Sequence, residues 1–129
     1  MENQQELIFK LSMFEQQIQQ MQQQIQAVEQ NILELQNLSE GLNEIKGSKD
    51  KNIKAMIGRG IFIESKITSE DLLVDVGGRN FVRKKIPETQ ELINEQVEKL
   101  KEAKESLNNS IEEISNEAEK LVGEFKGEN

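Results

Sequence analysis

The chain of 129 residues contains no Cys, His, Tyr or Trp. Without Cys it can form neither a disulfide framework nor a thiolate metal site. Without His and Cys it also lacks the commonest general base and the thiol nucleophile. Acidic neighbours such as Glu112 and Glu113 are typical of a solvated helix face. We therefore expect no catalytic residue, no metal site and no cofactor, and a protein that acts by binding.

Long hydrophobic runs are absent as well. No stretch approaches the roughly 20 apolar residues that a bilayer span requires. No basic region near the start precedes an apolar run, so the sequence predicts no signal peptide and no membrane association. The glycines at 58, 60, 77 and 78 lack the following Gly-Lys-Ser/Thr of a phosphate-binding loop. These absences predict a cytoplasmic protein that uses no nucleotide.

Charge is distributed in three blocks within a net charge of −8. Residues 1–45 hold seven acids and one base, residues 46–86 hold ten bases and five acids, and residues 87–129 hold five bases and twelve acids. Two acidic arms therefore flank a basic middle. The same blocks give the expected domains: a coiled-coil helix over 1–46, a double β-hairpin assembly region over 47–86, and a second coiled-coil helix over 87–129.

Both arms have the heptad spacing of a helix that buries one seam against another helix. In the first arm the seam consists of Leu7, Leu11, Phe14, Ile18, Met21, Ile25, Val28, Ile32 and Leu35. We expect it to continue through Leu38, Leu42 and Ile45, with a stammer that overwinds the coil between Leu35 and Leu38.

The second arm begins at Pro87, which suits the first turn of a helix. Its seam consists of Ile93, Val97, Leu100, Lys104, Leu107, Ile111, Ile114, Ala118, Leu121 and Phe125. The matching lengths of the arms predict an antiparallel coiled coil within the chain, with Phe125 near Leu7 and Ile93 near the Leu38 to Leu42 region. Lys104 is the one polar seam residue. It could snorkel to solvent or disfavour wrong registers.

The middle region changes to the short runs of β-branched and aromatic residues that are typical of strands. The runs are 53–57, 61–67, 72–76 and 81–85, and they predict two hairpins whose turns contain Gly58-Arg59-Gly60 and Gly77-Gly78. A four-stranded meander of this length has little to pack against and leaves two open edges. We therefore expect strand pairing between subunits, and hence an oligomer.

Apolar residues spread beyond the seam where the arms begin and end. Ile8, Phe9 and Met13 fall at outward heptad positions, and Val122 lies beside Leu121 and Phe125. Single exposed apolar residues need no explanation at a helix end, but three within six positions indicate an exposed patch for a partner. The candidate binding residues are Leu7, Ile8, Phe9, Leu11, Met13, Phe14, Leu121, Val122 and Phe125.

The order of coil, two hairpins and coil resembles the alpha-class subunits of prefoldin. The resemblance is carried by the motifs at 56–63 (Met-Ile-Gly-Arg-Gly-Ile-Phe-Ile), 73–78 (Leu-Val-Asp-Val-Gly-Gly) and 81–85 (Phe-Val-Arg-Lys-Lys). It implies an α+β fold in which a long antiparallel two-helix coiled coil carries two β-hairpins that contribute to an intersubunit β-barrel. The implied assembly residues are Ile57, Gly58, Gly60, Ile61, Phe62, Ile63, Leu73, Val74, Val76, Gly77, Gly78, Phe81 and Val82.

The same resemblance implies a function and a set of partners. It implies an archaeal-type, ATP-independent chaperone subunit in a hexamer of two alpha and four beta subunits. The coil tips would capture unfolded client proteins and deliver them to a group II chaperonin.

Two other functions remain open from the sequence. A structural filament or scaffold protein would polymerise through the sheet and have inert tips. A nucleic-acid-binding module would use the basic run Arg79, Arg83, Lys84 and Lys85, but the acidic arms and the lack of interleaved exposed aromatics argue against nucleic acid.

Overall fold

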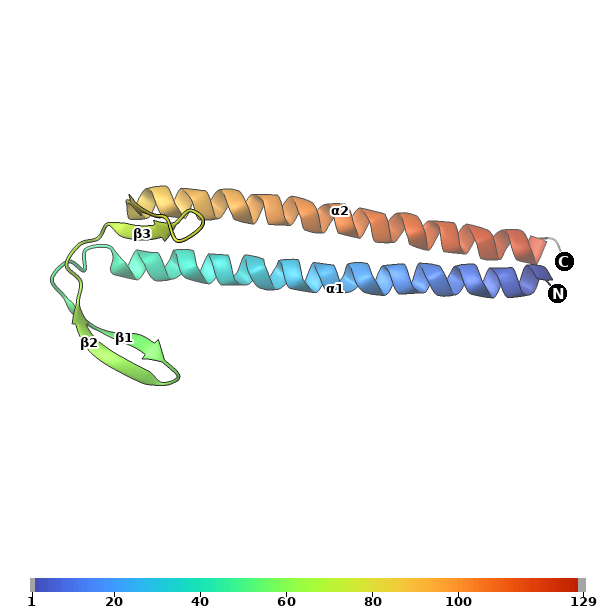
Figure 1. Cartoon of the computed structure of the whole chain (residues 1–129). Coiled ribbons are helices and arrows are strands. Elements are labelled where there is room, and N and C mark those ends of the chain that lie inside the picture. Colours follow the sequence, from blue (N-terminus) through green and yellow to red (C-terminus); the bar gives the residue numbers. More distant parts are fainter. Residues whose placement is uncertain (1, 128–129) are drawn as a thin grey trace. The chain divides into compact units, whose positions relative to one another are not determined.

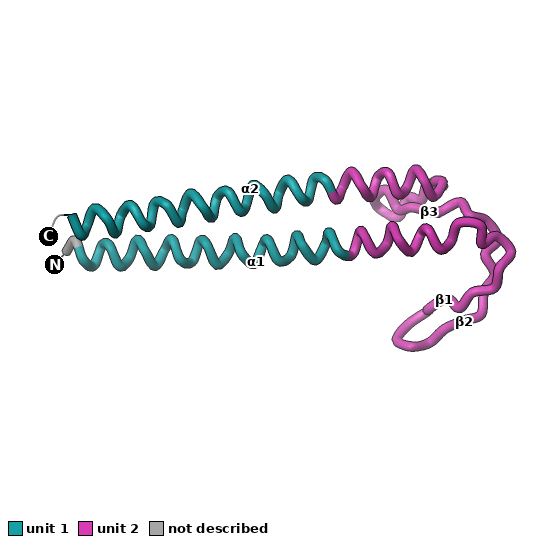
Figure 2. Tube along the Cα trace, turned by 180° about the vertical axis from the view of Figure 1, so that it is seen from behind, with its two compact units in different colours: residues 1–33, 98–129 teal, residues 34–97 magenta. Residues whose placement is uncertain are grey.

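The structure is a computed structural model that describes residues 2–127, with side chains from residue 4. Helix α1 (Glu2–Ile45) leads into strands β1 (Asn52–Gly58), β2 (Ile61–Lys66), β3 (Leu72–Asp75) and β4 (Phe81–Lys84), and helix α2 (Ile86–Gly127) follows, as Figure 1 shows. Two long helices with two small antiparallel hairpins between them confirm the predicted fold class. The chain divides into a unit of residues 1–33 and 98–129 and a unit of residues 34–97 (Figure 2).

The first unit, which we call the arm unit, contains the start of α1 and the end of α2 side by side (Figures 1 and 2). Along α1 the predicted seam residues from Leu7 to Ile32 are half-buried, while their neighbours are exposed. The facing stretch of α2 repeats this pattern from Leu100 to Phe125. This alternation follows from the heptad spacing, which turns one stripe of each helix toward the other.

Lys104 leaves the seam to pair with a carboxylate on the other helix. Its Nζ lies 3.1 Å from Oε1 of Glu29, and both side chains are partly exposed. A lysine that starts at a seam position and carries its ammonium to the partly exposed rim has the snorkelling arrangement. The pair also shows that the two helices run antiparallel with residue 29 opposite residue 104.

The second unit, which we call the hairpin unit, holds the most deeply buried side chains among the described residues. These are Leu42 on α1, and Ile86, Ile93 and Val97 on α2. Nearby, the Gln90 amide donates hydrogen bonds to the carbonyl oxygen of Ser39 (3.0 Å) and to Oδ1 of Asn43 (2.7 Å). The α1 and α2 segments of this unit are therefore joined by both apolar packing and amide contacts.

The predicted continuation of the seam through Leu38 is wrong. Leu38 is 53% exposed, whereas the neighbouring Ser39 is half-buried and faces Gln90. The steps from Leu35 to Ser39 and from Ser39 to Leu42 are four and three, so the heptad continues without the predicted stammer. Leu38 instead lines a groove with β3 residues such as Leu73. Leu38 therefore belongs to the groove beside β3 and not to the seam between the helices.

Helix α1 is followed by a glycine that turns the chain and by a serine that donates to two of the last carbonyl groups of the helix. Gly47 has φ of 74°, a left-handed conformation that favours glycine after a helix end. The Ser48 amide then donates to the Ile45 carbonyl, and the Ser48 hydroxyl donates to the Glu44 carbonyl, both at 3.0 Å. Burial of Ser48 is therefore accompanied by hydrogen bonding.

The four strands form two separate two-stranded sheets, β1 with β2 and β3 with β4, so the expected four-stranded meander is not present. In the first hairpin Met56 lies opposite Phe62, and the register shifts around Ile57 before Gly58 pairs with Ile61. In the second hairpin Val74 lies opposite Val82. Each sheet consequently has two unpaired strand edges within the described chain.

The second hairpin turns one residue later than its sequence suggests. The Asn80 amide donates to the Gly77 carbonyl at 3.0 Å, which makes Gly78 and Arg79 the two central turn residues. Their φ angles are 59° and 62°, as a type I′ hairpin turn requires. Arg79 therefore adopts a left-handed conformation that costs a residue with a Cβ atom about 1–2 kcal/mol.

We expect Arg79→Gly to stabilise the β3–β4 hairpin by about 0.5–1 kcal/mol, because glycine adopts positive φ without a steric penalty. Hydrogen exchange of the β3 and β4 backbone amides measures this change. Arg59→Gly is the matched control: Arg59 in the first turn has no positive φ, so the substitution should destabilise its hairpin by about 0.5–1 kcal/mol. Equal effects at the two positions would contradict the assignment of strain to Arg79.

We also expect Lys104→Leu to raise the free energy of unfolding by about 1 kcal/mol. A partly exposed ion pair contributes roughly 0–1 kcal/mol, whereas a leucine in the seam would bury more apolar area. Thermal and denaturant unfolding followed by circular dichroism measure the change. Lys101→Leu on the exposed face, where Lys101 pairs with Glu98 of its own helix, should change stability by less than about 0.5 kcal/mol.

Candidate functional site

Three large apolar side chains are exposed near the start of α1 in the arm unit. Ile8 is 60% exposed, Phe9 is 66% exposed and Met13 is 45% exposed. The heptad places them outside the seam formed by Leu7, Leu11 and Phe14, and the structure has them pointing to solvent for that reason. Residues on the helix surface at spacings of four, such as Phe9 and Met13, are neighbours.

The end of α2 supplies the other predicted residues of this region. Leu121, Val122 and Phe125 are half-buried. The pairing of Glu29 with Lys104 fixes an offset that, continued along both helices, places Phe125 one residue from the position opposite Leu7. The predicted tip residues therefore come together at one end of the arm unit, although Val122 is less exposed than its outward heptad position suggested. We call these nine residues the tip surface.

The chemistry of the tip surface is that of apolar contact. Phenylalanine and methionine offer polarizable area, and methionine adapts its shape to varied partners. Among residues 2–127 no group of three or more acidic side chains is placed to hold a metal ion. The arrangement can bind exposed apolar segments of another molecule, with little dependence on their exact shape.

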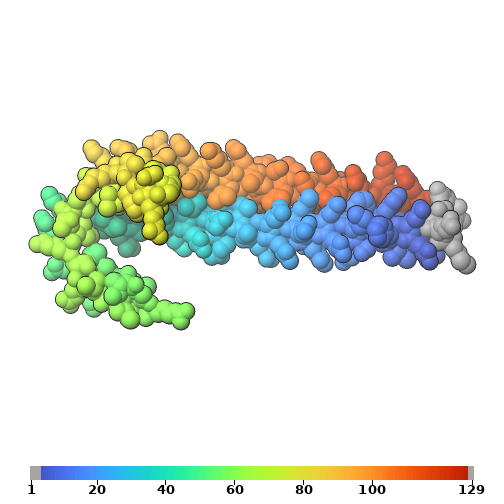
Figure 3. Space-filling view, in the orientation of Figure 1, coloured from blue at the N-terminus to red at the C-terminus, as the bar shows by residue number. Residues whose placement is uncertain are grey.

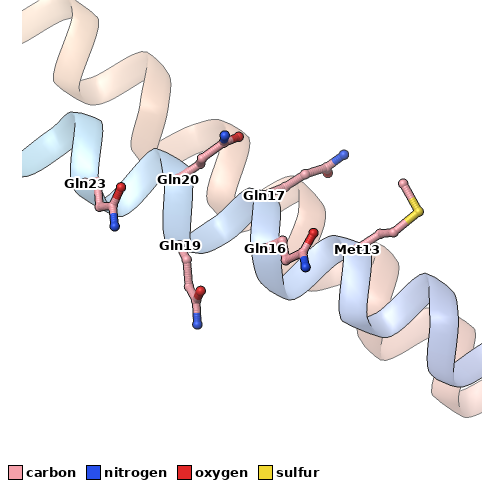
Figure 4. Close-up of a pocket in the computed structure, with 6 residues that line it drawn as sticks. All are labelled: Met13, Gln16, Gln17, Gln19, Gln20 and Gln23. Atoms are coloured by element: carbon pink, nitrogen blue, oxygen red, sulfur yellow. The ribbon is translucent and has the colours of Figure 1, made fainter.

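Sequence reasoning missed a groove that adjoins the tip surface on α1. It is lined by Met13 and by five glutamines, Gln16, Gln17, Gln19, Gln20 and Gln23, and its volume is about 330 Å³ (Figure 4). These glutamines lie at positions outside the seam of α1, and the heptad spacing alone gives no indication of a groove there. The signal available in the sequence was the absence of charge from residues 16–28.

The hairpin unit carries the larger share of exposed apolar side chains. Ile57 is 68% exposed, Ile61 60% and Phe81 61%, and the β1–β2 hairpin is not covered by other segments of its unit (Figure 3). Both faces of this hairpin are affected, since Met56 and Phe62 form a cross-strand pair on one face and Ala55 and Ile63 on the other. Of the predicted assembly residues, Val74 is half-buried, and the other apolar ones are exposed.

The same unit contains an apolar groove of about 430 Å³ beside β3. The buried Leu42 and Ile93 both line it, so Ile93 lies near the Leu38 to Leu42 region as expected. The exposed Leu38, Leu73 and Leu92 also contribute to the lining.

No helix within residues 2–127 is long and apolar enough to cross a membrane.

Comparison with known proteins agrees with this geometry. The family model described as "Prefoldin subunit" matches residues 14–127. A curated relative, the prefoldin subunit alpha of Methanosphaera stadtmanae, is 30% identical over 89 residues, which cover 69% of this chain and 64% of the relative. A cryo-EM structure of filamentous PFD from Methanocaldococcus jannaschii matches with a TM-score of 0.81 at 20% identity, covering 89% of this chain and 97% of that one.

Two long helices that flank two small antiparallel hairpins match the fold of that archaeal structure. The chain belongs to the prefoldin family. Prefoldins are a family of chaperones.

Proposed function

We propose that this chain is a subunit of an ATP-independent holdase that captures unfolded polypeptides at the tip surface. The observation that carries the proposal is the exposure of Ile8, Phe9 and Met13 within six residues of one helix. Apolar side chains that remain in contact with water, as these three do, add no stability to the end of a helix. Unfolded polypeptides expose apolar segments, and burying them here would remove apolar area from water on both partners.

The exposed hairpins support a second part of the proposal, which concerns partners. The chain assembles through β1 to β4 into a hexamer of two alpha-class and four beta-class subunits in the cytoplasm, where the hairpins contribute to a shared β-barrel. Pairing between subunits would satisfy the open strand edges and cover the apolar residues of both hairpin faces. Captured clients are then delivered to a group II chaperonin.

A filament or scaffold without client binding is the alternative function. It is favoured by the likeness to a filamentous protein, whose printed description names that form of assembly. The two proposals differ in how the subunits associate. A closed hexamer that forms only with a beta-class partner in native mass spectrometry would support the chaperone, and open-ended homopolymers would support the filament.

We expect the combined substitution of Ile8, Phe9, Met13 and Val122 by Ser to abolish protection of a denatured client from aggregation. Removing three exposed large apolar side chains and Val122 should weaken client binding at least about tenfold. Light scattering by the client, with the assembled complex present, measures this protection.

Phe9→Ser and Leu33→Ser form a matched pair for the same assay. Both residues are exposed on α1, at 66% and 51%, but Leu33 lies outside the tip surface. Only Phe9→Ser should reduce protection. Unchanged protection by the fourfold variant, with assembly intact, would sink the assignment of the tip surface.

Assembly is tested separately on the first hairpin. Ile61→Lys together with Phe62→Lys should leave the chain largely monomeric in native mass spectrometry, because adjacent strand residues point to opposite faces and both faces would carry a charge. The helical circular dichroism signal should persist. Glu64→Lys on the same strand is the control and should still assemble, since Glu64 is not part of the apolar surface. Normal oligomers of the double variant would rule out the hairpin as the assembly site.

A further inference from the structure

A shallow groove runs along the outward face of α1 in the arm unit, between two rows of side chains. Met13, Gln17 and Gln20 form one row, and Gln16, Gln19 and Gln23 form the other (Figure 4). All six side chains are exposed, and the volume between them is about 330 Å³. We call this feature the amide groove.

The amide groove is continuous with the tip surface through Met13, which belongs to both. Phe9, Met13, Gln16, Gln20 and Gln23 follow one another at steps of four, three, four and three, which keeps them on one face of the helix. A molecule that covers Phe9 and Met13 and extends along α1 therefore lies over the glutamines.

The composition of this stretch differs from that of the rest of the chain. Residues 16–28 contain no charged residue and eight glutamines, whereas 31% of the whole chain is charged. Glutamate and lysine form helices about as well as glutamine, so helix formation does not explain the choice. An uncharged amide surface gives up the repulsion and strong hydration that charged faces use to avoid association.

We propose that the amide groove binds the backbone of an extended, unfolded polypeptide whose apolar side chains contact the tip surface. The inference rests on the proposed holdase function and specifies what is recognised. Each glutamine side chain has a carbonyl acceptor and two N–H donors. The backbone of an unfolded chain offers the matching donors and acceptors at every residue except proline. Because the glutamine amides and the peptide groups of the backbone are all uncharged, this recognition does not depend on the charged side chains of the client.

The dimensions of the groove set how much backbone it holds. From Gln16 to Gln23 the helix rises about 10 Å, which matches about three residues of extended chain. Only a few hydrogen bonds form at once, each with a small net contribution because water competes for both partners. The groove therefore adds a small contribution to affinity that is independent of client sequence.

A second copy of this chain is the competing occupant, through pairing of glutamine faces. The structure favours the polypeptide, because Met13 is the only apolar side chain that lines the groove. Two such faces packed together would bury little apolar area.

The test compares two fluorescent peptides of about 12 uncharged residues with the same leucines, one of them N-methylated at alternate backbone nitrogens. Binding to the full chain, in the oligomer that it forms, is measured by fluorescence anisotropy. The unmodified peptide should bind about 3- to 10-fold more tightly, as expected for one or two lost hydrogen bonds. The combined variant Gln16→Ala, Gln20→Ala and Gln23→Ala should lose this difference and bind the methylated peptide as the wild type does.

The matched control is Gln22→Ala, Gln24→Ala and Gln26→Ala, on the same helix but outside the groove. It should retain the difference between the peptides. Equal binding of the two peptides to the wild type, or an equal loss in the control variant, would overturn the proposal. A change in oligomeric state without a change in peptide affinity would also overturn it, in favour of a second copy.

Failure of the proposed function has a different result. Ile8→Ser with Phe9→Ser should weaken both peptides together, and if it weakens neither, the tip surface is not the binding site. Alanine favours helix at least as well as glutamine, and unchanged circular dichroism confirms that the groove variants fold.

Discussion

The pairing of two helices along one narrow apolar seam is the interaction on which the rest of the structure depends. A seam of one stripe per helix buries little, and among the described residues only Leu42, Ile86, Ile93 and Val97 are buried apolar side chains. The arm unit has none that is fully covered. All other apolar side chains must remain partly exposed or be covered by other molecules. This constraint explains why exposed apolar surface is abundant in a chain with so few aromatic residues.

The exposed side chains are not spread evenly. Among the side chains that the structure describes, sixteen large hydrophobic ones are exposed: ten belong to the two hairpins or the residue after β3, and three belong to the tip surface. The hairpin unit thus resembles a core that lacks its other half, as expected for an obligate interface. The smaller set at the tip has no strand edges beside it, so it suits contacts that form and break.

The helices and their pairing could be predicted from the sequence because the heptad period states which face is buried. The position of Lys104 could be predicted in the same way, since the long aliphatic part of a lysine can lie in a seam while its ammonium group reaches the solvent. The position of Leu38 could not, because it lines a groove beside β3, a strand far along the sequence, and helix periodicity carries no information about β3. The separation of the two sheets also escaped prediction, since Ile67 continues the first hairpin by bonding with Lys51 and Asp50 before the chain turns away.

The exposure of Ile8, Phe9 and Met13 could be predicted, because apolar residues outside the heptad seam are visible from spacing alone. The amide groove could not, since two rows of glutamines are apparent only when the side chains are placed around the helix. Arg79 is a similar case: two adjacent glycines indicate a turn, but the backbone uses the second glycine and the arginine as its centre. In each case the missing information was the direction of a side chain or the exact residue at a turn.

The division of four strands into two independent sheets has a consequence for assembly that polymer chemistry describes well. A chain with two separate pairing elements is a difunctional monomer, since each hairpin can join a different neighbour. Such monomers alone give rings or chains of indefinite length, and growth stops when a monofunctional partner occupies the free ends. The ratio of this chain to any such partner, and not the fold of this chain alone, would then set the length of the assembly.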